Sequence, residues 1–109
     1  MLAWLKTVVN LGPRDQLAEI EQREPSLEER LERLIGRLGT YSRRTANELE
    51  EIMSDLEKVL DIVERMIFAL EHIGGAERAR NLRKRLRNHR TRARRAFETL
   101  SGSANEPAA

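Results

Sequence analysis

The 109-residue chain contains no cysteine, which excludes a disulfide scaffold, a thiolate metal site and a cysteine nucleophile. Aromatic residues are scarce, at 4% of the chain, whereas charged residues make up 35%. This balance fits a β-sandwich or a deep ligand pocket poorly, and it suits helices that bury narrow apolar stripes. The composition therefore predicts one all-α domain.

The sequence also lacks an apolar run close to the ~18 residues that span a bilayer. Its first eleven residues are apolar but have neither the basic start nor the small-residue cleavage pattern of a signal peptide, so we expect a cytoplasmic protein. No HExxH motif, phosphate-binding glycine loop or nucleophile elbow is present. We therefore expect no catalytic residues, no cofactor and no small-molecule substrate.

Proline and glycine residues divide the chain into segments. The first break is Gly12-Pro13, where Pro13 suits the first position of a helix. The second is Pro25-Ser26, and Ser26 with Glu29 forms a capping-box pattern for a helix that begins there. These signals predict short helices before residue 45.

Two further breaks follow in the second half of the chain. Gly39–Thr45 is either a break or a bend in a continuous helix, and Thr45 with Glu48 offers another capping box. Gly74-Gly75 ends one long helix and permits a tight reversal into the next. After residue 100 the sequence loses its periodicity, so we expect a disordered tail over 101–109.

Hydrophobic spacing predicts two long helices on either side of the double glycine. In the first, a strict 4-3-4-3 row and a second row beside it widen the apolar face to about 200°, which requires at least two neighbouring helices. In the second, the apolar residues lie within about 100°, the width of a single packing seam. The seam consists of Ala79, Leu82, Leu86, His89, Ala93, Ala96, Phe97 and Leu100.

We accordingly predict an all-α fold built on a long antiparallel helical hairpin over 45–100, with its turn at 74–75. Amphipathic and short helices occupy 1–44. The surplus apolar arc of the first long helix predicts that the bundle is completed by self-association, as a homo-oligomer. Eight residues are candidates for self-association or partner contact: Leu2, Trp4, Leu5, Val9, Ile62, Met66, Phe68 and Ile73.

Charge is distributed unevenly along the predicted hairpin. Residues 46–73 hold eight acids against two bases, a net charge of −6, and residues 76–100 hold ten bases against two acids, a net charge of +8. Nine of the ten bases are arginine, which favours bidentate contacts to phosphate or carboxylate. The candidates for binding a polyanion are Arg80, Arg83, Lys84, Arg87, Arg90, Arg94 and Arg95.

Two interpretations of the arginine-rich helix stay open. In the one that we predict, the protein is a non-enzymatic assembly module whose arginine-rich helix binds a polyanion, above all nucleic acid, through phosphates and without sequence readout. Stacking aromatics are missing from this face, which disfavours binding of single strands by base stacking. Otherwise the neighbouring acidic helix supplies the carboxylates, although it reaches only the arginines that flank the seam. In the second case the protein is a scaffold or adaptor for an acidic protein partner. A third possibility is a peripheral membrane protein that uses the N-terminal amphipathic helix.

The sequence predicts no metal site. Glu48, Glu51 and Asp55 lie on one helix face, but a di-iron bundle needs Glu-x-x-His pairs, and neither His72 nor His89 follows an acid at that spacing. We expect a solvated or arginine-paired acidic face instead. His89 lies in the apolar seam and is interpreted as a packing or register-setting residue.

Overall fold

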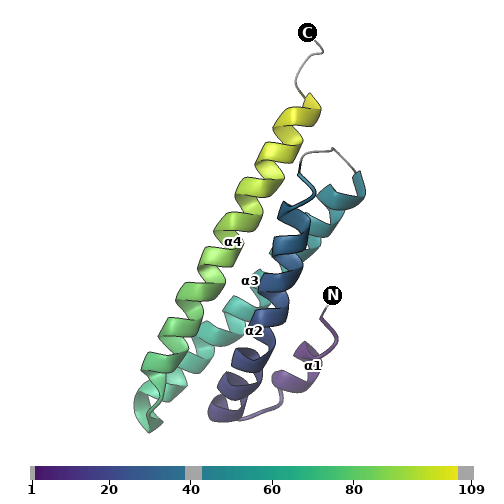
Figure 1. Ribbon diagram of the computed structural model, residues 1–109. Coiled ribbons are helices and arrows are strands. Elements are labelled where there is room, and N and C mark those ends of the chain that lie inside the picture. Colours follow the sequence, from purple (N-terminus) through teal and green to yellow (C-terminus); the bar gives the residue numbers. More distant parts are fainter. Residues whose placement is uncertain (1, 39–42, 106–109) are drawn as a thin grey trace.

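The computed structural model describes residues 2–38 and 43–105, and side chains up to residue 102. Four helices follow one another: α1 (Leu5–Val8), α2 (Pro13–Ile35), α3 (Arg43–Ile73) and α4 (Ala76–Asn105) (Figure 1). Every regular element within these described ranges is a helix, which confirms the predicted all-α class. None of the described helices is both long and apolar enough to cross a membrane.

The two longest helices, α3 and α4, run in opposite directions side by side (Figure 1). The chain reverses at Gly74 and Gly75, whose φ angles of 94° and 99° lie in the left-handed region. A side chain is strained there, so glycine is required at both positions. The Gly74 N–H donates a hydrogen bond to the Leu70 carbonyl at 2.7 Å, which closes the last turn of α3.

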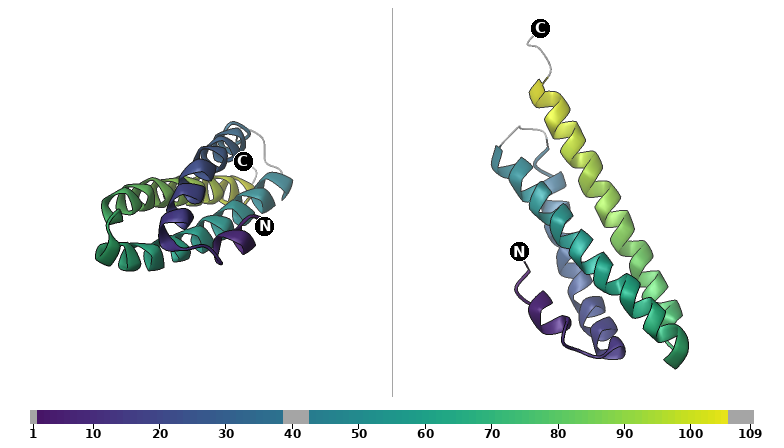
Figure 2. Two further views of the ribbon diagram at one scale, coloured as in Figure 1. Left: turned by 90° about the horizontal axis from the view of Figure 1, so that it is seen from below. Right: turned by 180° about the vertical axis from the view of Figure 1, so that it is seen from behind.

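Helix α3 is the central helix of the bundle. It packs against α4 on one side and α2 on the other, and α1 packs against α2 (Figure 2). The wide apolar arc from which we predicted a second subunit is therefore largely covered within the same chain. Its buried apolar residues are Leu49, Ile52, Leu56, Val59, Leu60, Ile62, Val63, Met66, Ile67 and Leu70.

Helix α2 runs without a break through Pro25, so the predicted break at Pro25-Ser26 is wrong. Ser26 is an exposed residue inside the helix and does not cap it. An interior proline costs about 3 kcal/mol through its lost hydrogen bond and its clash with the preceding turn. The residues of α2 that face the bundle keep 3-4 spacing across Pro25, so a continuous helix buries them all on one stripe. That burial outweighs the cost of the proline. The residues of the stripe are Leu17, Ile20, Glu24, Leu27, Leu31 and Leu34.

Other helix boundaries also differ from the predictions. Thr45 is buried inside α3, which begins at Arg43, so Thr45 is not its N-cap. Helix α4 continues to Asn105, so the tail predicted to be disordered from residue 101 is helical up to that point, and residues 106–109 lie outside the described residues. Helix α2 ends at Ile35. The sequence left open whether 39–45 is a break or a bend. Most of that question concerns residues 39–42, which also lie outside the described residues.

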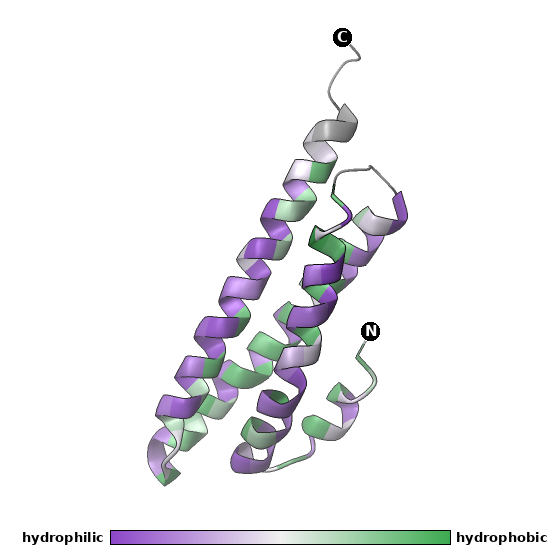
Figure 3. Ribbon diagram, viewed as in Figure 1, coloured by the Kyte–Doolittle hydropathy of each residue, from purple (hydrophilic) through white to green (hydrophobic). Residues whose placement is uncertain are grey.

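Hydrophobic and hydrophilic residues separate clearly on the long helices. Figure 3 shows hydrophobic positions on the sides of α2, α3 and α4 that face one another, and hydrophilic positions along the outer side of α4. Because α4 buries one narrow seam between α2 and α3, its basic residues emerge on both flanks of that seam. This arrangement places them within reach of carboxylates on two different helices.

Candidate functional site

One row of arginines on α4 pairs with the acidic face of α3. The row has 3-4-3 spacing, and its two central members share one carboxylate, that of Glu64. Each end of the row is paired with a separate glutamate. Each arginine donates to a carboxylate oxygen: Arg80 to Glu71 at 3.0 Å, Arg83 to Glu64 at 3.1 Å, Arg87 to Glu64 at 2.8 Å and Arg90 to Glu57 at 3.1 Å.

A second row on α4 pairs with α2 on the other flank. Its three arginines lie seven residues apart, the spacing that keeps side chains on one edge of a helix. Two of the matching glutamates on α2 precede Pro25 and one follows it, so the full row depends on the continuity of the helix through Pro25. The pairs are Arg78 with Glu21, Arg85 with Glu24 at 2.7 Å and Arg92 with Glu32 at 2.6 Å.

The two rows change the interpretation of the arginine-rich helix. Seven of its ten bases form ion pairs with carboxylates of the same chain, and three of these pairs are with glutamates of α2, which was not expected to supply carboxylates. Among the described residues, Lys84, Arg94 and Arg95 are the bases of this helix for which no ion pair is seen. Four of the seven predicted polyanion-binding residues therefore already have a partner: Arg80, Arg83, Arg87 and Arg90.

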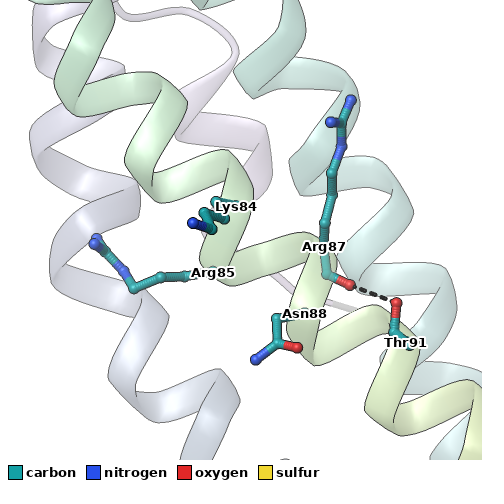
Figure 4. Close-up of a pocket in the computed structure, with 5 residues that line it drawn as sticks. All are labelled: Lys84, Arg85, Arg87, Asn88 and Thr91. Carbon is teal, nitrogen blue, oxygen red and sulfur yellow. Dashed lines mark hydrogen bonds between the residues drawn. The ribbon is translucent and has the colours of Figure 1, made fainter.

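A shallow hollow on the outer side of α4 is lined by Lys84, Arg85, Arg87, Asn88 and Thr91 (Figure 4). Figure 4 shows Arg85 extending towards α2 and Arg87 extending towards α3, while the Thr91 hydroxyl donates to the Arg87 carbonyl at 3.0 Å. Both guanidinium groups thus leave the hollow for their glutamates. Of its three cations, Lys84 alone lacks a carboxylate partner among the described residues.

The N-terminal segment and α3 enclose a groove of about 310 Å³, which we call the α1–α3 groove. Its apolar lining comes from four of the eight predicted contact residues, three of them in the N-terminal segment. Three cations and one acid line the rest. The apolar residues are Leu2, Leu5, Val9 and Ile62, and the charged residues are Lys6, Lys58, Asp61 and Arg65.

The other four predicted contact residues are not gathered there. Met66 is a core residue, 1% exposed, and is not available to a partner. Trp4 is half-buried, with the Arg23 guanidinium 5.6 Å from its ring centre. Phe68 is 70% exposed and meets His72 edge-to-face at 5.6 Å between ring centres, and Ile73 is exposed at the end of α3.

Two buried carboxylates lie along the inward side of α2. Asp55 of α3 is 1% exposed and accepts a hydrogen bond from Arg30 at 3.1 Å. Glu24 accepts one from Arg85 and also lies 3.6 Å from Nε2 of His89, which is in turn 3.7 Å from Glu28. His89 is buried in the α4 seam, as the spacing predicts, but its acidic surroundings come from α2.

Glu24 and Glu28 were not among the predicted site residues, because the predicted helix break lies between them. One signal was available. The apolar spacing from Leu17 and Ile20 to Leu27 puts position 24 on the inward stripe if the helix continues. A glutamate at such a position needs a cation or a polar partner from the opposing helix.

No protein-family model, no curated protein sequence and no solved structure matches this chain. No residue role can therefore be transferred from a relative. Three features of the molecule are candidates for function: the α1–α3 groove, the outer side of α4 and the buried polar residues between α2 and α4.

Proposed function

We propose that this chain is a non-enzymatic scaffold or adaptor module that binds an acidic protein partner in the α1–α3 groove. The observation that carries the proposal is the chemistry of the groove lining, an apolar surface with three cations and one acid beside it. In this proposal the hairpin of α3 and α4 is a platform held together by the buried apolar seam of α4.

The groove fits the binding of an amphipathic helix. The apolar stripe of a partner helix would contact exposed Val9 and half-buried Leu2, beneath which Leu5 and Ile62 are buried. Its acidic residues would meet Lys58 and Arg65. Among the described residues, neither Lys58 nor Arg65 is seen in an ion pair, so both are available to a partner's carboxylates.

Charge disfavours two other occupants of the same groove. A second copy docked symmetrically would bring two predominantly basic linings face to face, which is unfavourable. A membrane surface would need the apolar face of α1, but Leu5 and Val8 are buried against the rest of the chain. Lys6 is the one basic residue on that short helix, too little charge for stable attachment to anionic lipid.

The proposal predicts binding of an acidic amphipathic helical peptide, built from leucine and glutamate at helical spacing. Trp4, the one tryptophan in the chain, lies beside the groove residues Leu2 and Leu5 in sequence, and its fluorescence reports the titration. The double variant Lys58→Glu/Arg65→Glu should bind on the order of tenfold more weakly, because both attractions become repulsions. The matched control Lys84→Glu, on the outer side of α4, should bind like the parent chain.

The peptide titration and a mass measurement distinguish binding in the groove from its alternatives. Equal affinity for the double variant and the parent, or equal affinity for a lysine version of the peptide, contradicts the proposal. The free chain should have a mass of about 12.6 kDa in light scattering. A multiple of that mass that persists on dilution would favour the predicted homo-oligomer, with exposed Phe68 as the first contact residue to vary.

Polyanion binding is the second candidate function, favoured by one observation: Lys84, Arg94 and Arg95 are exposed on α4 without a carboxylate partner among the described residues. Three contacts give weak, non-specific binding to phosphates, those of nucleic acid above all. Stronger binding requires the paired arginines to exchange glutamate for phosphate.

Salt dependence distinguishes these two situations. If only the three unpaired bases contact duplex DNA, the slope of log affinity against log salt is about −3, and affinity falls about 40-fold between 50 and 200 mM salt. If the paired arginines also leave their glutamates and all ten bases contact DNA, the slope is about −9. Lys84→Glu/Arg95→Glu should abolish binding in the first case, while Lys58→Glu/Arg65→Glu should not. No gel retardation at about 50 mM salt would exclude this function.

A further inference from the structure

His89 is a buried imidazole with unused hydrogen-bonding capacity. It is 5% exposed, and neither of its ring nitrogens has a hydrogen-bond partner. An unpartnered buried polar atom destabilises the folded state, so such an atom calls for a physical explanation. For Nε2 the explanation lies on α2, from which two carboxylates face this nitrogen.

The three side chains converge on one point between α2 and α4. Nε2 of His89 lies 3.6 Å from Oε2 of Glu24 and 3.7 Å from Oε2 of Glu28. One ligand atom from each residue lies within 4.8 Å of the others. The two distances from Nε2 are too long for hydrogen bonds but close to the ~3.4 Å between two ligands of a tetrahedral Zn²⁺ ion at its usual bond lengths.

We propose that Glu24, Glu28 and His89 bind a divalent transition-metal ion, with Zn²⁺ as the best fit. The ion would take one carboxylate oxygen from each glutamate and Nε2 of the imidazole, leaving a fourth position for water. Glu24 and Glu28 are one helical turn apart on α2, and His89 comes from α4. The site therefore joins two helices that are distant in sequence. It is independent of the groove proposal.

Arg85 positions one of the three ligands. Its Nε donates to Oε1 of Glu24 at 2.7 Å, which leaves Oε2, the oxygen nearer His89, directed at the site. A hydrogen-bonded partner behind a ligating carboxylate is the usual arrangement around protein metal ions. The two carboxylates exceed the one guanidinium in charge, so the site retains a net negative charge for a dication.

The donor set decides which ions fit. Imidazole nitrogen suits Zn²⁺ and other first-row transition metals, whereas Mg²⁺ and Ca²⁺ prefer oxygen ligands throughout. His89 and Glu24 are buried, which excludes most of the surrounding water, and Glu28 is exposed, which gives an ion a route from solvent. We therefore expect no comparable binding of Mg²⁺ or Ca²⁺.

The test is a calorimetric titration of the full chain, first treated with a chelator, with Zn²⁺ alone. We expect saturable binding of one ion per chain. We also expect the unfolding temperature to rise by about 5 °C or more at a hundredfold excess over the Kd, because only the folded chain holds the three ligands together. Co²⁺ in place of Zn²⁺ should give the visible absorption of a low-coordinate site.

Two variants remove a ligand by different means. Glu28→Gln changes an exposed carboxylate and leaves the core intact, and His89→Leu replaces the imidazole with a residue suited to the apolar seam. Each should lose at least tenfold in Zn²⁺ affinity and most of the thermal shift. The control Glu29→Gln, an exposed neighbour on α2, should bind like the parent chain.

Three results would overturn the proposal. The first is the absence of saturable Zn²⁺ or Co²⁺ binding to the folded chain. The second is undiminished binding by both Glu28→Gln and His89→Leu. The third is loss of binding in His72→Ala together with retention in His89→Leu, which would place the ion at the exposed histidine of α3. Circular dichroism of each variant verifies that the helices are intact in the comparison.

Discussion

Replacement of Arg30 by methionine is expected to lower the free energy of unfolding by about 3 kcal/mol. Asp55, its partner at 3.1 Å, is 1% exposed, so the substitution leaves a carboxylate buried without its guanidinium. The estimate lies at the low end of the range for buried pairs, because the Arg30 side chain keeps 26% of its surface in solvent. Urea unfolding followed by circular dichroism measures the loss.

A second substitution distinguishes the buried charge from lost packing. The double variant Arg30→Met/Asp55→Leu removes both charges and should recover the parent stability to within about 1 kcal/mol. The control Arg33→Met alters an exposed arginine on the same helix and should change stability by less than about 0.5 kcal/mol. Equal losses for Arg30→Met and Arg33→Met would mean that the ion pair with Asp55 contributes nothing specific.

The two long helices and their reversal could be predicted because local sequence rules act on them directly. The row from Leu49 to Leu70 keeps helical spacing throughout, and the double glycine occupies the positions where the chain has positive φ. In each case the signal lies within a few residues of the structure it determines. The all-α class follows from the same signals.

The continuity of α2 could not be predicted from the rule that was applied to it. Proline disfavours a helix interior, and a serine-glutamate pattern favours a helix start, so both local signals at Pro25 point to a break. A non-local interaction decides the outcome instead: a continuous helix buries Leu27 and Leu31 on the same stripe as Leu17 and Ile20. Tertiary packing overrides local propensity at this point.

That single error also explains why the site was predicted incompletely. With a break at Pro25, Glu32 does not share a helix with Glu21 and Glu24, so a continuous row of three glutamates facing α4 is not expected. Once α2 is continuous, Glu21, Glu24 and Glu32 face Arg78, Arg85 and Arg92, and Glu28 reaches His89. Sequence patterns indicated which residues carry charge, but pairing depends on which helices are neighbours.

Replacement of Leu86 by alanine is expected to lower the free energy of unfolding by about 3 kcal/mol. Arg87→Gln, at the adjacent position, should lower it by less than about 1 kcal/mol. Leu86 is completely buried in the seam between α2 and α3, and its truncation leaves a cavity. Arg87 forms a 2.8 Å ion pair, but about half of each side chain is in solvent, and Glu64 keeps Arg83 as a second partner. Urea unfolding of both variants gives the comparison.

These two values decide what holds α4 in place. If Leu86→Ala is the more damaging change, the apolar seam fixes the helix and the arginine rows contribute mainly register and partner choice. In about 1 M salt, charges are screened beyond ~3 Å. The difference in free energy of unfolding between Leu86→Ala and the parent chain should then stay the same as at low salt. Weak pairing also means that Arg83, Arg87 and Arg90 can exchange a glutamate for an external phosphate without unfolding the bundle. A cost for Arg87→Gln as large as that for Leu86→Ala would reverse this ranking and make the arginine rows a fixed part of the fold.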